Sequence, residues 1–347
     1  MLNMPRILLI SLLTFCAFST QAKPDIEQFF TSEAKIYNAE TCFRKPFDSY
    51  RGWMAMMQQS MKRRSQDELA LNRRLERFKS MFPLSSFEKY LSNLDCITFE
   101  YKVDNEVVSG YLVRPKGNDP LPIIVYNRGG NGDFGAMVFG AIMNQIMPLS
   151  EQGFIVIGSQ YRGTFQEGGL FKDEFGGADV EDVVSLVNRL QYLKHAKHDS
   201  IGMFGSSRGG MQSLLALKQL DNTVKTAVLL AGNYDLKRDL TIRPSMETIY
   251  EKRIPNYATE KDAQLRKRSA LYWSHEINPE LPILLQHGDQ DKRVNVYNSK
   301  ALAKQFKATN RPHILSIYEG DDHGLSNNQD EAFSERVMWF TEHLIQN

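Results

Sequence analysis

The spacing of apolar residues divides the chain into a helical first part and a longer part in which strands and helices alternate. After residue 65, apolar side chains recur at intervals of four, three and four, at Leu71, Leu75, Phe78 and Phe82. This spacing places them on one face of an α-helix, which Pro83 ends. We therefore expect residues 23–95 to form a short helical N-terminal extension.

From Cys96 onward the pattern changes to a period of two. Apolar residues alternate in 97–103 and follow again in 107–113, on either side of a turn at 104–105, which predicts a β-hairpin. Short apolar runs then alternate with helical stretches, at residues 122–126, 154–159, 201–204, 227–230, 283–286 and 314–318. Such alternation is typical of a mostly parallel central sheet with helices on both faces, so we predict an α/β fold for residues 96–347.

One stretch interrupts this rhythm. Residues 233–274 are rich in Arg, Lys, Tyr and Glu, and they lie between two predicted strands near the carboxyl edge of the sheet, where α/β proteins bind ligands. We expect them to form either a cap insertion that faces the substrate or a plain surface excursion.

The first 22 residues have a different character. Arg6 precedes an apolar run at residues 7–18, and a small-residue stretch ends at Ala22, which is the pattern of a cleaved signal peptide. The run is shorter than the roughly 20 apolar residues that span a bilayer. We predict export to the periplasm or the medium, with no stable membrane span after cleavage; an uncleaved anchor is the alternative.

Charge and cysteine content add two constraints. The chain has 42 Lys plus Arg against 41 Asp plus Glu, a net charge of +1, so nothing indicates a nucleic acid or another polyanion as partner. The mature chain keeps Cys42 and Cys96, which form a candidate disulfide in an oxidising compartment. Two buried free thiols are the alternative, and the oligomeric state is not indicated.

The sharpest chemical signal is Gly205-Ser206-Ser207-Arg208-Gly209, which fits the pattern G-x-S-x-G between a predicted strand and a helical run. A strand that reverses into a helix within a few residues leaves no room for side chains two positions before and after the serine. Glycine at both positions removes that clash. We predict Ser207 as a nucleophile; Ser206 and a purely structural turn are the alternatives.

A serine hydroxyl needs a general base, and the base needs an orienting acid. His323 lies in a loop after the last predicted strand, from which an imidazole can reach the serine; a surface histidine is the alternative. Asp289 and Asp291 follow the preceding strand, in the chain order Ser, Asp, His of α/β-hydrolases. Strand geometry alone does not choose between them. His287 is expected to be a structural loop residue.

The oxyanion that forms on a substrate carbonyl needs preorganised donors. We expect one from the backbone N–H of Arg208 and a second from the glycine-rich loop 127–132, with the backbone of Arg128 and Gly129 as candidates; a flexible turn is the alternative for this loop. The sequence has no Cys/His metal spacing, phosphate loop or dinucleotide fingerprint, so it implies no cofactor and no metal.

Together these residues resemble the catalytic domain of the prolyl oligopeptidase family of serine peptidases, within the α/β-hydrolase superfamily. The resemblance runs from about residue 108 to the C-terminus. It rests on the serine motif and on five further stretches, 161–163, 174–182, 268–270, 287–294 and 322–324. In the family's pattern the triad acid lies four residues after the histidine of His-Gly, here His287-Gly288, so the resemblance implies Asp291.

Two features depart from that family. Many members carry a β-propeller before the catalytic domain, and residues 23–95 are too few and too helical for one. Arg128 stands where some members place a tyrosine or histidine, so a tyrosine hydroxyl is not implied as an oxyanion donor. The sequence thus predicts an exported serine hydrolase that acts on a short peptide or small molecule, foremost as a serine peptidase. A carboxylesterase and a catalytically silent binding protein of the same fold are the alternatives.

Overall fold

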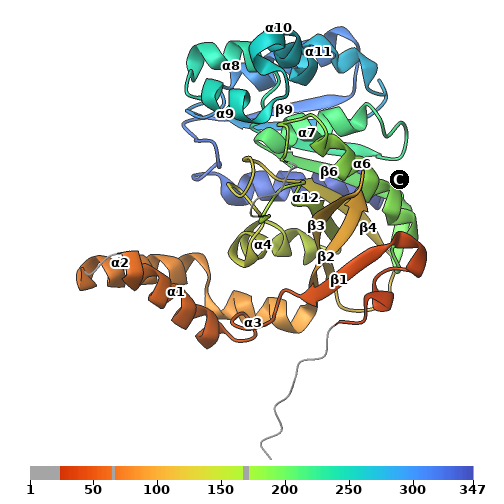
Figure 1. Ribbon diagram of the computed structural model, residues 1–347. Helices are drawn as coiled ribbons and strands as arrows, with labels where there is room; N and C mark the ends of the chain where they lie inside the picture. The colour runs from red at the N-terminus through yellow and green to blue at the C-terminus, as the bar shows by residue number, and fades with distance from the viewer. Residues whose placement is uncertain (1–23, 65–66, 167–171, 347) are drawn as a thin grey trace, which may run out of the picture.

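The computed structural model describes residues 24–64, 67–166 and 172–346. The predicted signal peptide, residues 1–22, lies outside them. The described chain has an α/β fold in which helices cover both faces of a central sheet (Figure 1). This confirms the predicted fold class.

The described residues contribute nine strands to one sheet, in the order β1-β2-β3-β5-β4-β6-β7-β8-β9. Neighbours from β5 through β4 to β9 run parallel, whereas β1, β2, β3 and β5 pair antiparallel. The strands are β1 Ile36–Thr41, β2 Leu94–Val103, β3 Glu106–Pro115, β4 Leu121–Asn127, β5 Ile155–Ser159, β6 Ala196–Ser206, β7 Thr226–Leu230, β8 Ile283–Gly288 and β9 His313–Tyr318. The predicted hairpin is β2 and β3, and it is confirmed.

Alternate residues of each buried strand belong to two different cores. Along β4, Ile123 and Val125 pack on one face, and Ile124 and Tyr126 pack on the other. Both faces of a parallel sheet are covered, which explains why these strands are apolar throughout. The first face is covered by α6 Asp179–Arg189, α7 Arg208–Leu217 and α11 Tyr297–Ala308, and the second by α3 Leu84–Asn93, α4 Phe139–Gln145, α5 Met147–Ser150 and α12 Gln329–Leu344.

Between β7 and β8 the chain forms three further helices in the segment 233–274. They are α8 Leu236–Ile242, α9 Met246–Arg253 and α10 Tyr257–Arg268. Short 3₁₀ helices complete the described elements, at Ile26–Gln28, Ser32–Ala34, Leu190–Tyr192, Ala270–Tyr272 and Ser274–Glu276. None of the described helices combines the length and apolar character needed to cross a bilayer.

The N-terminal extension is only partly helical, which corrects the sequence-based expectation. It contains α1 Tyr50–Arg64, α2 Glu68–Met81 and α3, of which α1 and α2 extend to one side of the molecule (Figure 1). It also contains β1, which pairs antiparallel with β2 and widens the sheet by one edge strand. Trp53 of α1 joins the extension to α4, because its ring packs edge-on against Phe139 with centroids 4.9 Å apart.

A disulfide joins Cys42, just after β1, to Cys96 in β2. It closes a loop over a sequence separation of 54 residues. In the chain-entropy model such a loop stabilises the fold by about 4 kcal/mol, because the bridge restricts the unfolded chain.

We therefore expect the Cys42→Ala/Cys96→Ala double variant to lose about 4 kcal/mol of unfolding free energy. Urea denaturation of oxidised wild type and the variant measures this loss. Wild type treated with a reductant is the control and should match the variant. Equal midpoints for oxidised wild type and the variant would contradict the expectation.

Candidate active site

Ser207 lies on a strained turn between the end of β6 and the start of α7. Its φ of 57° and ψ of −126° belong to a region that residues with a side chain rarely adopt. A Cβ added at Gly205 would lie 2.3 Å from the carbonyl oxygen of Gly209, and one at Gly209 would lie 1.9 Å from that of Asn127. Both glycines are therefore required by close backbone packing, as the motif predicts.

His323 contacts a buried carboxylate. Its Nδ1 lies 2.6 Å from Oδ2 of Asp291, whose Oδ1 accepts hydrogen bonds from the backbone N–H groups of Arg293 and Val294 at 2.7 and 3.0 Å. Because a carboxylate only accepts, Nδ1 of His323 carries a proton in this contact, and Nε2 is then the ring nitrogen that can accept one from a neighbouring hydroxyl.

The environment of Asp291 favours its charged form. Burial raises the pKa of this carboxyl group, but hydrogen bonds from His287 and His323 outweigh burial and hold the pKa below its usual range. The carboxylate is therefore ionised at neutral pH, as an acid that orients an imidazole must be.

The structure brings Asp291, not Asp289, to His323. Oδ1 of Asp289 instead accepts the N–H of Gly320 at 2.7 Å. His287 was expected in a loop, but it is a buried residue of β8. Its Nε2 lies 3.1 Å from Oδ2 of Asp291 and 3.0 Å from the carbonyl oxygen of Val294, so it helps to hold the acid in place.

Gly129 packs directly against the serine. A Cβ at this position would lie 3.0 Å from Cβ of Ser207 and 3.1 Å from the carbonyl oxygen of Ser206. The backbone of the loop 127–132 thus approaches the serine closely, and the N–H of Arg208 begins α7 beside it. These are the backbone groups expected to bind an oxyanion.

The side chain of Arg128 organises the same loop. The guanidinium is buried, and it donates to the carbonyl oxygens of Gly132 and Gln160 at 2.8 and 2.6 Å and to Oγ1 of Thr164 at 2.9 Å. Sequence reasoning considered only the backbone of Arg128. The side chain acts as an internal scaffold that fixes the curvature of the loop.

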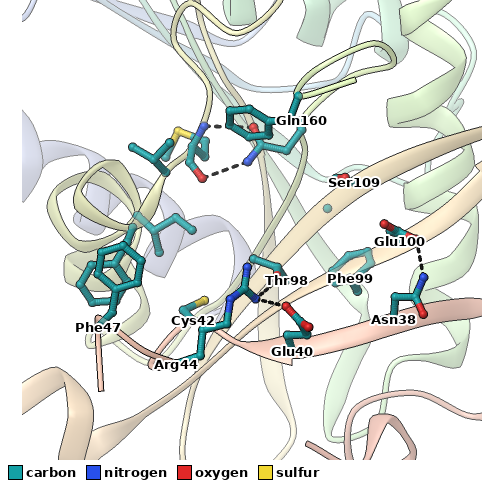
Figure 2. A pocket seen from close by; sticks show the side chains of 16 residues that line it. Asn38, Glu40, Cys42, Arg44, Phe47, Thr98, Phe99, Glu100, Ser109 and Gln160 are labelled. Atoms are coloured by element: carbon teal, nitrogen blue, oxygen red, sulfur yellow. Dashed lines mark hydrogen bonds and ion pairs between the residues drawn. The ribbon is translucent and has the colours of Figure 1, made fainter. Parts of the chain in front are cut away.

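Gln160 fixes the chain beyond this loop. Its side-chain amide accepts the N–H of Met137 at 3.0 Å and donates to the carbonyl oxygen of Met137 at 2.9 Å. Figure 2 shows this pair of bonds on the wall of a separate cavity of about 550 Å³, between the strands β1 to β3 and residues 137–142. Hydrogen bonds therefore fix the chain at Arg128 and at Met137, on either side of the glycine-rich stretch between them.

Arg208 is buried, and its side chain joins three segments. The guanidinium pairs with Asp173 at 2.9 Å and Asp179 at 2.6 Å, and it donates to the carbonyl oxygen of Gly130 at 2.9 Å. Burial raises the pKa of Asp179, but Arg208 and backbone N–H groups of the segment just before α6 outweigh it and lower the pKa. We call Arg208, Asp173 and Asp179 the buried ion cluster.

Ser207 and His323 line one cavity of about 570 Å³. The segment 233–274 forms part of its wall through Asn233, Asp239, Arg243, Met246 and Ile249. Burial raises the pKa of Asp239 to about 6, although Asn233 and Asn298 donate hydrogen bonds to it. The wall that faces the serine is thus a mixture of charged and apolar groups.

Nowhere in residues 24–64, 67–166 and 172–346 do three His, Cys, Asp or Glu side chains gather as a metal site would require.

Replacing Gly129 by alanine is expected to slow acylation of Ser207 by about 100-fold, because the added Cβ displaces a loop that carries an oxyanion donor. The rate of labelling by a fluorophosphonate measures this effect. Gly140→Ala is the matched control, because its Cβ would meet nothing closer than a ring atom of Phe82 at 3.4 Å. Equal labelling rates in the two variants would contradict the role of the loop.

A serine on a strand-to-helix turn, a histidine paired with a buried aspartate and a glycine-rich loop over the serine form the arrangement typical of α/β-hydrolases. The model of the prolyl oligopeptidase family matches residues 141–347. The chain belongs to this family, and it is a hydrolase of the serine-peptidase type.

The chain is similar to individual proteins in sequence and in fold. The chain is 27% identical to the uncharacterized peptidase YtmA of Bacillus subtilis over 205 residues, which cover 59% of this chain and 77% of YtmA. The acylaminoacyl peptidase of Pyrococcus horikoshii matches with a TM-score of 0.61 and 19% identity, over 74% of this chain and 43% of that one. The acetyl xylan esterase of Paenibacillus sp. R4 matches with a TM-score of 0.55 and 16% identity, over 72% of this chain and 85% of the esterase.

Other curated relatives are much longer than the matched part. The match covers only 34%, 38% and 33% of three of them. Likeness to the two solved structures shows the fold, so their substrates are not carried over to this chain.

Proposed function

We propose that the chain is an exported serine peptidase that cleaves amide bonds of short peptides through Ser207, His323 and Asp291. The observation that carries this proposal is the 2.6 Å contact between His323 and the buried Asp291, together with a cavity that His323 shares with Ser207. Membership of the prolyl oligopeptidase family supports an amide substrate.

The proposed reaction follows from the positions of these groups. Nε2 of His323 takes the proton of Ser207 as the hydroxyl attacks the carbonyl carbon. The backbone N–H groups of Arg208 and of the loop at Gly129 stabilise the oxyanion. His323 then returns the proton to the leaving amine, and water hydrolyses the acyl-enzyme by the same steps in reverse. Asp291 keeps the imidazole in the required tautomer throughout.

A carboxylesterase is the second candidate. The acetyl xylan esterase matches over 85% of its own length, so a protein of nearly the same extent as this α/β unit is named for ester hydrolysis. The same triad would serve either substrate, because both reactions pass through a tetrahedral oxyanion.

Parallel assays of short peptide amides and activated esters with the purified mature protein separate the two candidates. Cleavage of peptides with kcat/KM comparable to that for esters is the expected result. Ester turnover without peptide cleavage would replace the peptidase proposal by the esterase. A wild-type protein that no fluorophosphonate labels would remove both and leave a binding protein of this fold.

Export is supported by two observations. Residues 1–22 have the pattern of a signal peptide, and the disulfide between Cys42 and Cys96 suits an oxidising compartment. Cell fractionation and N-terminal sequencing test this part of the proposal. A mature chain that begins at Lys23 outside the cytoplasm is expected, and an intact N-terminus inside it would contradict export.

A further inference from the structure

A second cavity adjoins the active site on the side of α12. Its volume is about 530 Å³, which is within the range of small-ligand sites. Four residues line both this cavity and the one that contains Ser207, namely Tyr126, Gln145, Ser206 and His323. The two cavities therefore meet at the histidine.

The groups on each side of His323 differ. The oxyanion groups Gly129 and Arg208 line only the cavity on the side of residues 233–274. Gly324 and Leu325, which follow the histidine, line only the cavity on the side of α12. Because the histidine gives its proton to the leaving group, the leaving group must lie on the histidine side of the scissile bond. This assigns the α12 cavity to the leaving group, and we call it the leaving-group cavity.

Arg336 of α12 lines the leaving-group cavity. Its guanidinium lies 4.4 Å from the centre of the Phe204 ring, and its Nε donates to Oε1 of Gln286 at 3.2 Å. Within the described part of the chain it makes no ion pair and no other hydrogen bond, so its two terminal nitrogens are free to donate. Burial lowers the pKa of Arg336 to about 10, which still leaves it charged at neutral pH.

Among the described residues no neighbouring carboxylate forms an ion pair with Arg336, although the charge of Glu335 acts on it and opposes the effect of burial on its pKa. Glu335 is engaged elsewhere, accepting from Tyr318 at 2.6 Å and from Gln286 at 2.7 Å. Asp330 lines the same cavity and makes no ion pair with Arg336. Arg162 and Arg208 differ, because each pairs directly with a carboxylate. Arg128 differs in another way, because its terminal nitrogens already donate to carbonyl oxygens and to Thr164. Arg336 is thus a half-buried cation whose two terminal nitrogens have no hydrogen-bond partner among the described residues.

We propose that Arg336 binds a carboxylate on the leaving group, so that the preferred substrates are short peptides whose free C-terminal carboxylate lies one or two residues beyond the scissile bond. A planar guanidinium matches a carboxylate through two parallel hydrogen bonds, which a neutral amide cannot reproduce. The peptide substrates in this inference rest on the proposed function, whereas the recognition of a leaving-group carboxylate also applies to esters.

The first test compares short peptides that end in a free carboxylate with the same peptides carrying a C-terminal amide. Wild type is expected to prefer the free acids by about tenfold or more in kcat/KM. Arg336→Gln removes this preference, and Arg336→Lys keeps part of it because the positive charge remains. Lys304→Gln is the matched control: it removes one positive charge from an exposed site on α11 and keeps the full preference.

The second test keeps the inference separate from peptidase activity. The esters 4-acetoxybenzoate and methyl 4-acetoxybenzoate differ in the charge of their leaving groups. The ratio of their kcat/KM values is expected to fall about tenfold or more from wild type to Arg336→Gln. Thermal unfolding verifies that each variant is folded. If Arg336→Gln does not fold, Arg336→Lys is measured instead. Its ratio is expected to be lower than the wild-type ratio, because lysine keeps the charge but loses the two parallel hydrogen bonds.

The two tests together distinguish the inference about Arg336 from the peptidase proposal. A fall in the ester ratio without peptide cleavage supports Arg336 and overturns the peptidase proposal. Peptide cleavage with the same acid-to-amide ratio in wild type and Arg336→Gln overturns the inference and leaves the peptidase proposal intact. No cleavage of peptides and no change in the ester ratio overturns both.

Discussion

Replacing Ser207 by alanine is expected to lower kcat/KM by about 10⁴-fold or more and to abolish labelling by a fluorophosphonate. The hydroxyl is the only protein group in the proposed mechanism that forms a bond to the acyl carbon, and the oxyanion donors alone retain only a small residual rate. Mass spectrometry of the labelled protein and steady-state kinetics measure the two effects. The fold should be retained, because alanine is compatible with the space that the serine occupies.

Ser206→Ala is the control for this prediction. Ser206 precedes the nucleophile and lines the same cavity, so the substitution removes a hydroxyl from the same region and leaves Ser207 unchanged. Labelling is expected to persist in Ser206→Ala. Equal labelling of Ser207→Ala and wild type, or its loss in Ser206→Ala alone, would move the nucleophile to Ser206.

Replacing Asp291 by asparagine is expected to lower kcat by about 10⁴-fold. An amide at this position can present an N–H to Nδ1 of His323, which favours the tautomer whose Nε2 carries the proton and cannot act as a base. Single-turnover rates measure the chemical step directly, and circular dichroism verifies the fold.

Asp289→Asn is the matched control, because it is the same substitution two residues earlier. Its oxygen can still accept the N–H of Gly320, so the loop is kept. Its kcat is expected to remain within a few-fold of wild type. A large loss in Asp289→Asn together with a small one in Asp291→Asn would reverse the assignment of the acid.

The parts of the site that local geometry decides could be predicted from the sequence. A strand that reverses into a helix predicts glycine at positions 205 and 209 for steric reasons. In the structure a Cβ at either position would clash with a backbone carbonyl oxygen. The buried strands were predicted because apolar residues on both sides of a parallel sheet leave an unbroken apolar run. The disulfide was predicted from the two cysteines of the mature chain and from the oxidising compartment that export implies, and the structure contains it.

Other parts depend on contacts between distant segments. Residue pattern alone could not separate Asp289 from Asp291, because the choice is made by backbone N–H groups of Arg293 and Val294 that turn toward only one of them. Strand β1 was missed because it is short and partly exposed and its apolar residues do not alternate regularly with polar ones. The buried side chain of Arg128 was missed because two of its acceptors, Gln160 and Thr164, lie far along the chain.

The buried ion cluster has a consequence for how this site can be altered. The backbone N–H of Arg208 is one expected oxyanion donor. The side chain of the same residue donates to the carbonyl oxygen of Gly130, and so it holds the loop that is expected to supply the other donor. Asp173 reinforces this tie, because it accepts the N–H of Gly132 while it pairs with Arg208. Removing one partner of a buried ion pair is strongly destabilising. The two halves of the expected oxyanion site therefore cannot be adjusted independently. Substitutions that alter specificity are better tolerated in the walls of the two cavities, for example at Arg243 beside Ser207 and at Phe333 in the leaving-group cavity.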